Sequence, residues 1–446
     1  MLTTPGAAPL RATERLQIID SLRGIALLGI LLMNILMFAL PDNRENDIFL
    51  YNELSGPDYY TWWTINLFFE GTMRGIFSLL FGAGCVLLLE RLEKRTDPLT
   101  PAADIYYRRL LWLLAFGLID ANLLLWTGDV LFVYALGGMV LYPFRRLGTR
   151  PLLIIAAVAL VMGTLLGTLD MHGKKELRVK GEQAVLLAGQ GAKLTAEQTK
   201  QKEAWEEHLK EMAQAARLKA DAEQVETMRG GYFQVMGYLL PSNEKNQNLS
   251  PYGLFYWDLM VCFFLGMALF KAGVLTGLRS RRFYAGLMLA GYGLGLTLNY
   301  WEIRVWMDVQ LDETLLADRV FISWYEIRRV LVLLGHIGLI MLVYKAGIAK
   351  RLLAWLAAVG QMAFTNYLMQ SILCGLFFYG FGLGWYGALA RHEIYYVVFA
   401  IWGVQLIYSN IWLRHFHFGP FEWAWRSLTY WKRQPFRKGV PMMQIA

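Results

Sequence analysis

Cysteine and charge are both scarce in this chain. It has three cysteines in 446 residues, Cys85, Cys262 and Cys374, and each lies inside an apolar run. Buried thiols without regular spacing exclude a disulfide framework and the Cys/His patterns of zinc sites. Charged residues make up 17% of the sequence, against about 25% in ordinary soluble domains. The chain is therefore not expected to be a soluble, disulfide-rich or zinc-binding protein.

Common catalytic motifs are absent as well. The sequence contains no HExxH, GxSxG, CxxC, Walker or dinucleotide-binding pattern. Hydrolase, metalloenzyme and ATP-driven functions therefore have no support, and no metal is expected. The net charge of +8 would suit a nucleic-acid binder, but lysines and arginines fall in short clusters between apolar runs. Nucleic acid is therefore not an expected partner.

Long hydrophobic segments dominate what is present. Hydrophobic residues make up 56% of the chain, and its mean hydropathy is +0.35. The run from Ile18 to Leu40 is long enough to span a membrane, because about 20 apolar residues cross a hydrocarbon core of about 30 Å. Such windows predict ten spans, at 18–40, 62–89, 107–126, 130–144, 152–169, 253–274, 283–300, 325–345, 352–379 and 394–413. The predicted fold is an all-α, polytopic membrane helix bundle.

Lysine and arginine alternate between the short connections of these spans. One set of connections is rich in them, whereas the alternate set holds few: Arg44, Arg304, Arg319 and Arg391. This alternation predicts that the basic connections are cytoplasmic, and an even number of spans then makes both termini cytoplasmic. The first span has no evident cleavage site and is expected to be retained.

Four regions follow from this pattern: an N-terminal membrane half at 1–169, an extracytoplasmic insert at 170–250, a C-terminal membrane half at 251–413 and a cytoplasmic basic tail at 414–446. Within the insert, Thr195 and Gln198 form a capping-box pattern, and the glycines at 230–231 predict a helix stop. A thin apolar stripe follows the predicted helix: Trp205, Leu209, Met212 and Ala216. We expect this helix to pack on its own protein or on a second copy, and the insert to be dispensable for folding.

Ionisable residues interrupt the first span. Asp20 and Arg23 lie three residues apart near its cytoplasmic end, within pairing distance on one helical face. Gly24 allows another helix to approach closely there, and Asn34, deeper in the helix, needs a polar partner. Charges in a spanning helix cost about 2.5 to 3.5 kcal/mol each, so they either pair to hold helices together or serve a function. Both interpretations remain open for this pair.

The second span carries Glu70 and Arg74 four residues apart, with Ser78 one turn further on. In a continuous helix this spacing predicts an ion pair within one helix. Such a pair either stabilises the bundle or lines a polar path through it.

Two carboxylates and one histidine are the candidates for proton transfer. Asp120, with Asn122, ends the third span and Asp129 opens the fourth, so the two carboxylates are predicted to face one crevice on the outer side as base and orienting group. Asp129 equally fits a helix N-cap after Gly128. His336 is the only histidine inside a span, and a hydrogen-bonded packing role is the alternative to catalysis.

Five strings carry a resemblance to a known family: DSLRGIALLGILLMNI, FSLLFGAG, WTGDVLFVYAL, GQMAFTNYLMQSILCGLFFY and WLRHFHFGPFEWAWRSLTY. Together they resemble the bacterial YeiB family of inner-membrane proteins, from end to end apart from 170–250. That family is grouped more distantly with membrane acyltransferases related to heparan-alpha-glucosaminide N-acetyltransferase, and the DxxRG string at Asp20, Arg23 and Gly24 carries this second link. The resemblance implies a bundle of about ten helices in the bacterial inner membrane and transfer of an acyl group from cytoplasmic acyl-CoA to an acceptor.

The chain departs from those acyltransferases in one respect. They use a histidine in the outer loop after the first span, whereas residues 41–63 here contain none. YeiB relatives often carry a histidine where the third span ends, and the nearest residue here is Asp120. Either Asp120 or Asp129 replaces the imidazole as base, or the chain does not use that mechanism.

The leading hypothesis is a transmembrane acyltransferase that acts on an acceptor hydroxyl or amine at the outer face. Basic residues at the cytoplasmic end would bind the CoA phosphates: Arg23 with its partner Asp20, Arg108, Arg109, Arg145 and Arg146. A polar channel would carry the thioester inward: Asn34, Glu70, Arg74 and Ser78. An outer carboxylate would then deprotonate a small-molecule, lipid or glycan acceptor.

Two other functions compete with it. The first is a transporter or flippase of a small anionic metabolite or lipid, with Arg74 as the anion site and Glu70 or His336 as a proton relay. The second is a non-catalytic membrane scaffold with the insert as its partner surface. The lipid bilayer is the partner in every case, and a homo-oligomer is one option.

Overall fold

The computed structural model describes residues 17–95, 101–247 and 253–438. Within these ranges every element is helical, apart from one isolated bridge between Phe416 and Arg437. The all-α prediction is therefore confirmed. The helices are α1 Gln17–Ala39, α2 Asp42–Asn46, α3 Gly56–Phe68, α4 Thr72–Arg95, α5 Ala102–Asn122, α6 Leu131–Leu141, η2 Tyr142–Arg146, α7 Thr149–Gly189, α8 Ala196–Met212, α9 Gln214–Met228, α10 Tyr232–Asn246, α11 Leu254–Lys271, α12 Arg281–Asp308, α13 Leu316–Arg319, α14 Tyr325–Ala346, α15 Lys350–Gln361, α16 Ala363–Phe378, α17 Arg391–His415 and α18 Pro420–Tyr430.

Several of these helices are suited to a membrane. In the described part of the chain, five segments are long and apolar enough to cross one: Gln17–Ala39, Gly56–Lys94, Thr149–Gly189, Tyr325–Ala346 and Arg391–His415. The bent pair α15–α16 makes a sixth if it counts as one span. By contrast, α6 has only 11 residues and covers about 17 Å, too little to cross alone. The count of ten spans and the cytoplasmic side of the termini stay predictions.

Two predicted spans are interrupted. The 62–89 span breaks at residues 69–71 between α3 and α4, where Gly71 has φ +67°. Glycine adopts this conformation without the steric cost that a Cβ would bring. The 352–379 span bends by 79° between α15 and α16, at Met362. A broken helix exposes the unpaired backbone groups of its new ends to whatever packs there.

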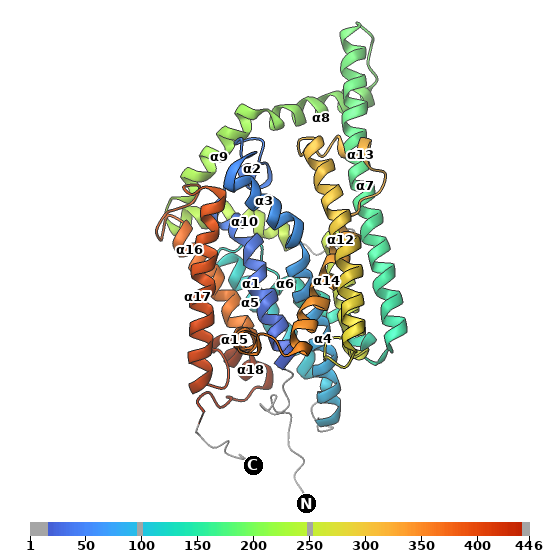
Figure 1. Ribbon diagram of the computed structural model, residues 1–446. Helices are drawn as coiled ribbons and strands as arrows, with labels where there is room; N and C mark the ends of the chain where they lie inside the picture. Colours follow the sequence, from blue (N-terminus) through green and yellow to red (C-terminus); the bar gives the residue numbers. More distant parts are fainter. Residues whose placement is uncertain (1–16, 96–100, 248–252, 439–446) are drawn as a thin grey trace, which may run out of the picture.

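Helix α1 lies at the centre of the bundle and packs closely on α15 (Figure 1). A Cβ on Gly24 would come within 2.0 Å of the Leu356 carbonyl oxygen, and one on Gly360 within 1.9 Å of the Asp20 carbonyl oxygen. The two backbones therefore touch, and the prediction that Gly24 permits close helix approach is confirmed.

The predicted insert begins as a continuation of a membrane helix. Helix α7 runs unbroken over 41 residues, about 60 Å, and α8 then crosses the upper end of the molecule toward α9 (Figure 1). The capping box of Thr195 and Gln198 is confirmed by reciprocal hydrogen bonds of 2.9 and 3.2 Å. The predicted 195–229 helix is divided at Ala213 into α8 and α9. Of its apolar stripe Trp205 is buried, against Gly181 of α7, whereas Leu209 and Met212 are exposed.

The second half of the insert is joined to the membrane part by polar contacts. Asp221 of α9 is buried and accepts hydrogen bonds from the backbone N–H of Asn43, 3.2 Å, and from the Tyr51 hydroxyl, 3.0 Å. Arg229 Nε donates to the Tyr386 carbonyl oxygen at 2.8 Å. The insert therefore packs on its own protein, because Asp221 of α9 is bound by Asn43 of α2 and by Tyr51, and Arg229 is bound by Tyr386. Its dispensability for folding stays a prediction.

The predicted basic tail at 414–446 also contains structure, as far as residue 438; its last eight residues, 439–446, lie outside the described residues. Helix α18 packs against α5 and α16 at the lower end of the bundle (Figure 1). Its Glu422 and Thr429 are buried. This segment forms part of the wall of a cavity, which Glu422 and Trp425 line.

Candidate binding cavity and carboxylate pair

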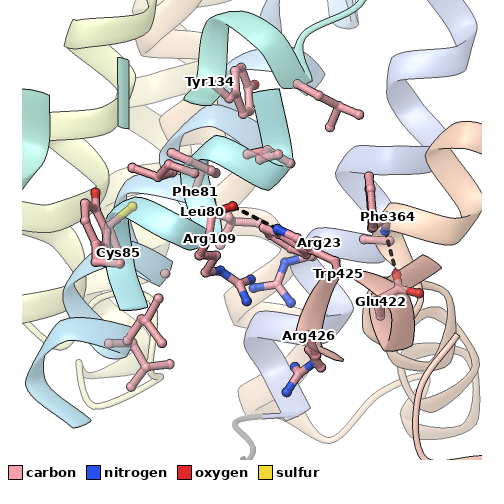
Figure 2. Close-up of a pocket in the computed structure, with 18 of the residues that line it drawn as sticks. Arg23, Leu80, Phe81, Cys85, Arg109, Tyr134, Phe364, Glu422, Trp425 and Arg426 are labelled. Carbon is pink, nitrogen blue, oxygen red and sulfur yellow. Dashed lines mark hydrogen bonds between the residues drawn. The ribbon is translucent and has the colours of Figure 1, made fainter. Parts of the chain in front are cut away.

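A cavity of about 260 Å³ opens at the lower end of the bundle, between α1, α4, α5, α15, α16 and α18. We call it the arginine cavity, because four arginines line it: Arg23, Arg91, Arg109 and Arg426. Glu422 is the one acidic side chain among its lining residues. Apolar and aromatic side chains cover its interior, among them Leu80, Phe81, Leu110, Leu113, Leu131 and Tyr134 (Figure 2). A cationic entrance with an apolar interior suits an amphiphilic anion.

Arg109 is the cation in this cavity with the least compensation. Its guanidinium lies 3.6 Å from the centre of the Trp425 ring, and the Trp425 indole donates to the Arg109 carbonyl oxygen at 2.9 Å. In the ranges that the structure describes, no carboxylate lies within ion-pair distance of Arg109. Figure 2 shows its guanidinium beside that of Arg23. Two adjacent like charges in a partly apolar site favour binding of an anion between them.

Glu422 does not compensate these arginines directly, because it caps the broken helix. One of its carboxylate oxygens accepts from the backbone N–H groups of Phe364 and Thr365, at 2.7 and 3.0 Å. The other accepts from the Thr365 hydroxyl at 2.5 Å. The start of α16, where the helix dipole is positive, is thus already occupied by a carboxylate of α18. Burial raises the pKa of Glu422, and the hydrogen bonds from Thr365 oppose that rise.

Tyr367 is buried and lines the arginine cavity. Its hydroxyl oxygen accepts hydrogen bonds from the Trp126 indole N–H, 3.0 Å, and from the Val130 backbone N–H, 3.1 Å. The hydroxyl proton is then directed to Asp129 Oδ1, 3.4 Å away. Two donors on the oxygen stabilise negative charge there, so this phenol is placed to pass a proton between the cavity and Asp129.

Asp129 and Asp120 lie together behind Tyr367, as the sequence suggested. Asp129 accepts from the backbone N–H groups of Leu131, 3.1 Å, and Phe132, 2.9 Å, at the start of α6, so it also has the predicted capping contacts. Asp120 is fully buried with Asp129 and Ser371 as polar neighbours. Neither of its carboxylate oxygens accepts a hydrogen bond of normal geometry from any residue in the described ranges. A fully buried carboxyl group with so few hydrogen-bond partners is costly to keep, which is characteristic of a functional group.

Of the other residues predicted to bind acyl-CoA, only some line the cavity. Arg23 pairs with Asp20 at 3.1 Å and lines the cavity. Arg108 does not line it, since its guanidinium donates to the Thr429 carbonyl oxygen at 3.2 Å and lies over Trp431. Arg145 and Arg146 instead pair with Glu93. Asn34 is half-buried on α1 and does not line the arginine cavity.

The predicted pair of Glu70 and Arg74 is not formed. Glu70 lies in the break before α4 and binds Arg328, 3.1 Å, whereas Arg74 binds Asp258 at 3.0 Å. The four-residue spacing was misleading because the helix does not continue through Gly71. Ser78 Oγ lies 2.5 Å from the Tyr134 hydroxyl at the edge of the arginine cavity. The single polar channel predicted from Asn34, Glu70, Arg74 and Ser78 is therefore split between separate sites.

His336 lies apart from the carboxylate pair. Its Nε2 is 2.8 Å from the Phe68 carbonyl oxygen and its Nδ1 is 2.7 Å from the Tyr292 hydroxyl. A carbonyl only accepts, so Nε2 carries the proton and the neutral ring accepts from Tyr292 through Nδ1. Both nitrogens are engaged in joining α12, α14 and the end of α3. The geometry is that of the packing role.

Comparison with known sequences shows which family this chain belongs to. A relative from Bacillus subtilis (strain 168), "Uncharacterized protein YxaH", is 31% identical over 452 residues, covering 96% of this chain and 98% of the relative. The family model "Protein of unknown function (DUF418)" matches residues 269–432. The chain belongs to the YeiB-like DUF418 family. "Uncharacterized protein YeiB" of Escherichia coli (strain K12) is 28% identical over 425 residues, covering 93% and 96% of the two chains. No solved structure matches significantly.

The DUF418 segment supplies one wall of the arginine cavity, from α16 and α18, including Phe364, Tyr367, Glu422, Trp425 and Arg426. The opposite wall comes from α1, α4 and α5. The cavity is thus assembled from both halves of the chain, and a fragment limited to the DUF418 segment would lack Arg23 and Arg109.

A second group of charged residues was missed by the sequence reasoning. Arg329 is buried and pairs with Asp258 and Glu326, and Arg328 joins Glu302 to Glu70. The signal was present, because two adjacent arginines interrupt the predicted 325–345 span. In the described ranges, no group of three or more His, Cys, Asp or Glu side chains is arranged to hold a metal ion.

Proposed function

We propose that this DUF418 protein is a multi-pass acyltransferase of the bacterial inner membrane, which moves an acyl group from cytoplasmic acyl-CoA to an acceptor hydroxyl or amine. The observation that carries the proposal is the continuity of one site. The cavity combines arginines with an apolar lining and Tyr367, and Tyr367 is hydrogen-bonded to Asp129, which lies beside the buried Asp120. The DUF418 relatives carry no assigned activity in their names, so the geometry alone supports this function.

Donor binding follows from the charge distribution. The CoA phosphates would lie at the four arginines of the entrance, where guanidinium groups form paired hydrogen bonds with phosphate oxygens. The pantetheine and acyl chain would occupy the apolar interior, which places the thioester toward Tyr367. The guanidinium groups of Arg109 and Arg23 lie beside each other (Figure 2) and would bind one phosphate together.

Proton transfer would pass through Tyr367. The acceptor oxygen or nitrogen attacks the thioester carbonyl carbon and gives its proton to the Tyr367 oxygen, while the Tyr367 proton moves to Asp129. The C–S bond breaks as the new C–O or C–N bond forms. The proton then returns through Tyr367 to the leaving sulfur, which departs as free CoA thiol. Asp120 would act beside Asp129 by sharing the proton, because two adjacent carboxylates do not readily both ionise.

Binding of acyl-CoA to the purified protein in detergent tests the donor site. We expect Arg109→Gln to weaken binding at least tenfold, because it removes the least compensated cation. Its sequence neighbour provides a matched control, since Arg108 lies outside the cavity and Arg108→Gln should bind normally. Equal effects of the two variants, or no binding by the unaltered protein, would refute the proposal.

Release of free thiol tests the chemical step. Tyr367→Phe removes the relaying hydroxyl while keeping the ring in its packing position, so acyl-CoA binding should persist and acceptor-dependent thiol release should fall at least a hundredfold. Retention of full activity by Tyr367→Phe would exclude the relay.

The bent helix supports transport as a second candidate function. Interrupted helices whose ends face a central cavity are typical of secondary transporters, and Gly360, Gln361, Ala363 and Phe364 at this break line the arginine cavity. The contacts around Arg74 do not support a proton relay to it, because Glu70 binds Arg328 and His336 binds the Phe68 carbonyl oxygen. Uptake of an anion into proteoliposomes without thioester cleavage would favour this candidate.

A further inference from the structure

A second cavity, of about 320 Å³, lies at the opposite end of α4, between α4, α7, α11, α13 and α14. We call it the insert-end cavity, because α7 leads from its wall into the insert (Figure 1). It shares no lining residue with the arginine cavity. Its lining combines charged side chains with aromatic ones, including Phe255, Trp306 and Tyr325. It therefore has to be explained separately from the donor site.

The inner wall is a preformed ionic cluster. Arg329, only 1% exposed, lies between the carboxylates of Asp258 and Glu326, and the Glu326 contact is 2.6 Å. Arg74 shares Asp258 at 3.0 Å, but 28% of its side chain stays accessible. Two arginines thus balance two carboxylates, and Arg74 is the member of this cluster that can still donate to a ligand. A guanidinium held in this way is suited to a phosphate or carboxylate group.

The rim is built to hold an ammonium group. Lys174 of α7 places its Nζ 2.9 Å from Asp170 and 2.5 Å from Glu313, which reaches it from the loop before α13. Both carboxylates are about half exposed, at 52% and 57%. An exposed pair of this kind adds little stability, so a ligand ammonium can take the place of Lys174 at small cost.

The rim also lies at the level where a membrane surface would be. The exposed face of α7 is apolar along Val158, Val161, Leu165 and Leu169, and the charged residues Asp170 and Lys174 follow immediately. Such a change from apolar to charged side chains marks the boundary between the hydrocarbon core and the lipid headgroups.

We propose that the insert-end cavity binds a phosphoethanolamine-type zwitterion, with its anionic group at Arg74 and its ammonium group at Asp170 and Glu313. The same chemistry is found in an aminophospholipid headgroup and in a soluble aminophosphate. The two sources differ in their acyl chains: a lipid-binding site should bind a ligand with acyl chains more tightly than the free headgroup. This site goes beyond the proposed donor chemistry, because neither Arg74 nor the rim carboxylates take part in it.

Tryptophan fluorescence of the purified full-length protein tests the site, since Trp306 lines the cavity. The probes are phosphoethanolamine, ethanolamine, which lacks the anion, and glycerol phosphate, which lacks the amine. We expect phosphoethanolamine to bind at least tenfold more tightly than either of the others. Tighter binding of short-chain phosphatidylethanolamine would identify the lipid as the source, and equal binding would identify the soluble headgroup. Equal binding of phosphoethanolamine and glycerol phosphate, or no binding of either, would overturn the proposal.

Four variants make the test specific. Arg74→Gln should reduce phosphoethanolamine binding at least tenfold, and Glu313→Gln about fivefold. Glu313 is exposed, so its variant keeps the test valid if Arg74→Gln fails to fold. Asp308→Asn, an exposed acid at the end of α12 outside the cavity, should bind normally. Arg23→Gln should also bind phosphoethanolamine normally, which separates this site from the donor site. A Glu313→Gln protein that binds as well as Asp308→Asn would remove the rim from the proposal.

Discussion

At the scale of single residues, Arg23 has two partners of opposite character. It forms an ion pair with Asp20 at 3.1 Å and faces the Arg109 guanidinium across the cavity entrance (Figure 2). If Arg23 binds phosphate, the planar fork matters, so Arg23→Lys should lose at least tenfold in acyl-CoA affinity with an unchanged melting temperature. Asp20→Asn should keep most of that affinity. An unchanged affinity of Arg23→Lys, together with a less stable Asp20→Asn, would show that the pair is structural.

Glu45, in the short helix α2 outside the membrane-spanning segments, should make stability depend on pH. Burial, reinforced by the charge of Asp42 and opposed by Arg391, raises the pKa of Glu45 to about 8 from an ordinary value of 4.5. The folded state therefore binds a proton that the unfolded state releases, and stability falls as pH rises from about 5 to 8.

Thermal melting in detergent between pH 5 and pH 8 measures this effect. Glu45→Gln cannot ionise, so its melting temperature should fall less over that interval than that of the unaltered protein. Parallel curves for the two proteins would show that another group governs the pH dependence.

Residue chemistry was predictable from the sequence where partners are close along the chain. Asp120 and Asp129 flank one tight turn, so their proximity could be predicted. Tyr367 could not be connected to them, because 238 residues separate it from Asp129 and only the tertiary fold brings it there. The Glu70 pairing was predicted wrongly, since a helical spacing rule was applied across a break that Gly71 permits.

At the scale of secondary-structure elements, the contact of α1 with α15 depends on two glycines. A side chain on Gly360 would overlap the Asp20 carbonyl oxygen. This oxygen belongs to the backbone of α1, so it cannot easily move away. We expect Gly360→Ala to destabilise the protein by about 1–3 kcal/mol, as other overpacked contacts do. Gly403 of α17 has open space around it, so Gly403→Ala is the matched control and should melt normally. Equal melting of the two variants would argue against the close contact.

Element prediction succeeded for hydrophobic helices and failed at their interruptions. Apolar windows identify where a helix forms, because burial of long apolar runs needs no tertiary information. They do not show where a helix bends, and the 79° angle at Met362 has no proline or glycine at the bend itself. The bend is stabilised instead by Glu422, which caps α16. Glu422 lies about 60 positions further along the chain.

At the scale of the whole molecule, the contacts between the insert and α2 predict that the insert contributes to the stability of the bundle. Asp221 is buried, and its removal would leave the Asn43 N–H and the Tyr51 hydroxyl without their acceptor. Asp221→Ala should cost about 1 kcal/mol, because it removes hydrogen bonds to donors that are only partly buried. Glu223, two residues away and exposed, supplies the control, since Glu223→Ala should be silent. An unaffected Asp221→Ala would restore the view that the insert is dispensable.

The joining of insert and membrane part has a consequence for the order in which the chain is made. Residues of the insert end are held by groups synthesised much later: Gly380 N–H donates to the Met228 carbonyl oxygen at 2.9 Å, and the Tyr386 carbonyl oxygen accepts from Arg229. A growing chain that has just completed α10 already has partners for α9 and α10 in α2 and α5, but it lacks those of Met228 and Arg229. The contacts at the end of α9 must wait through the synthesis of about 150 further residues, at roughly 5–20 residues per second. We therefore expect an interval of many seconds in which this end of the insert is exposed to proteases and chaperones on the side where it emerges.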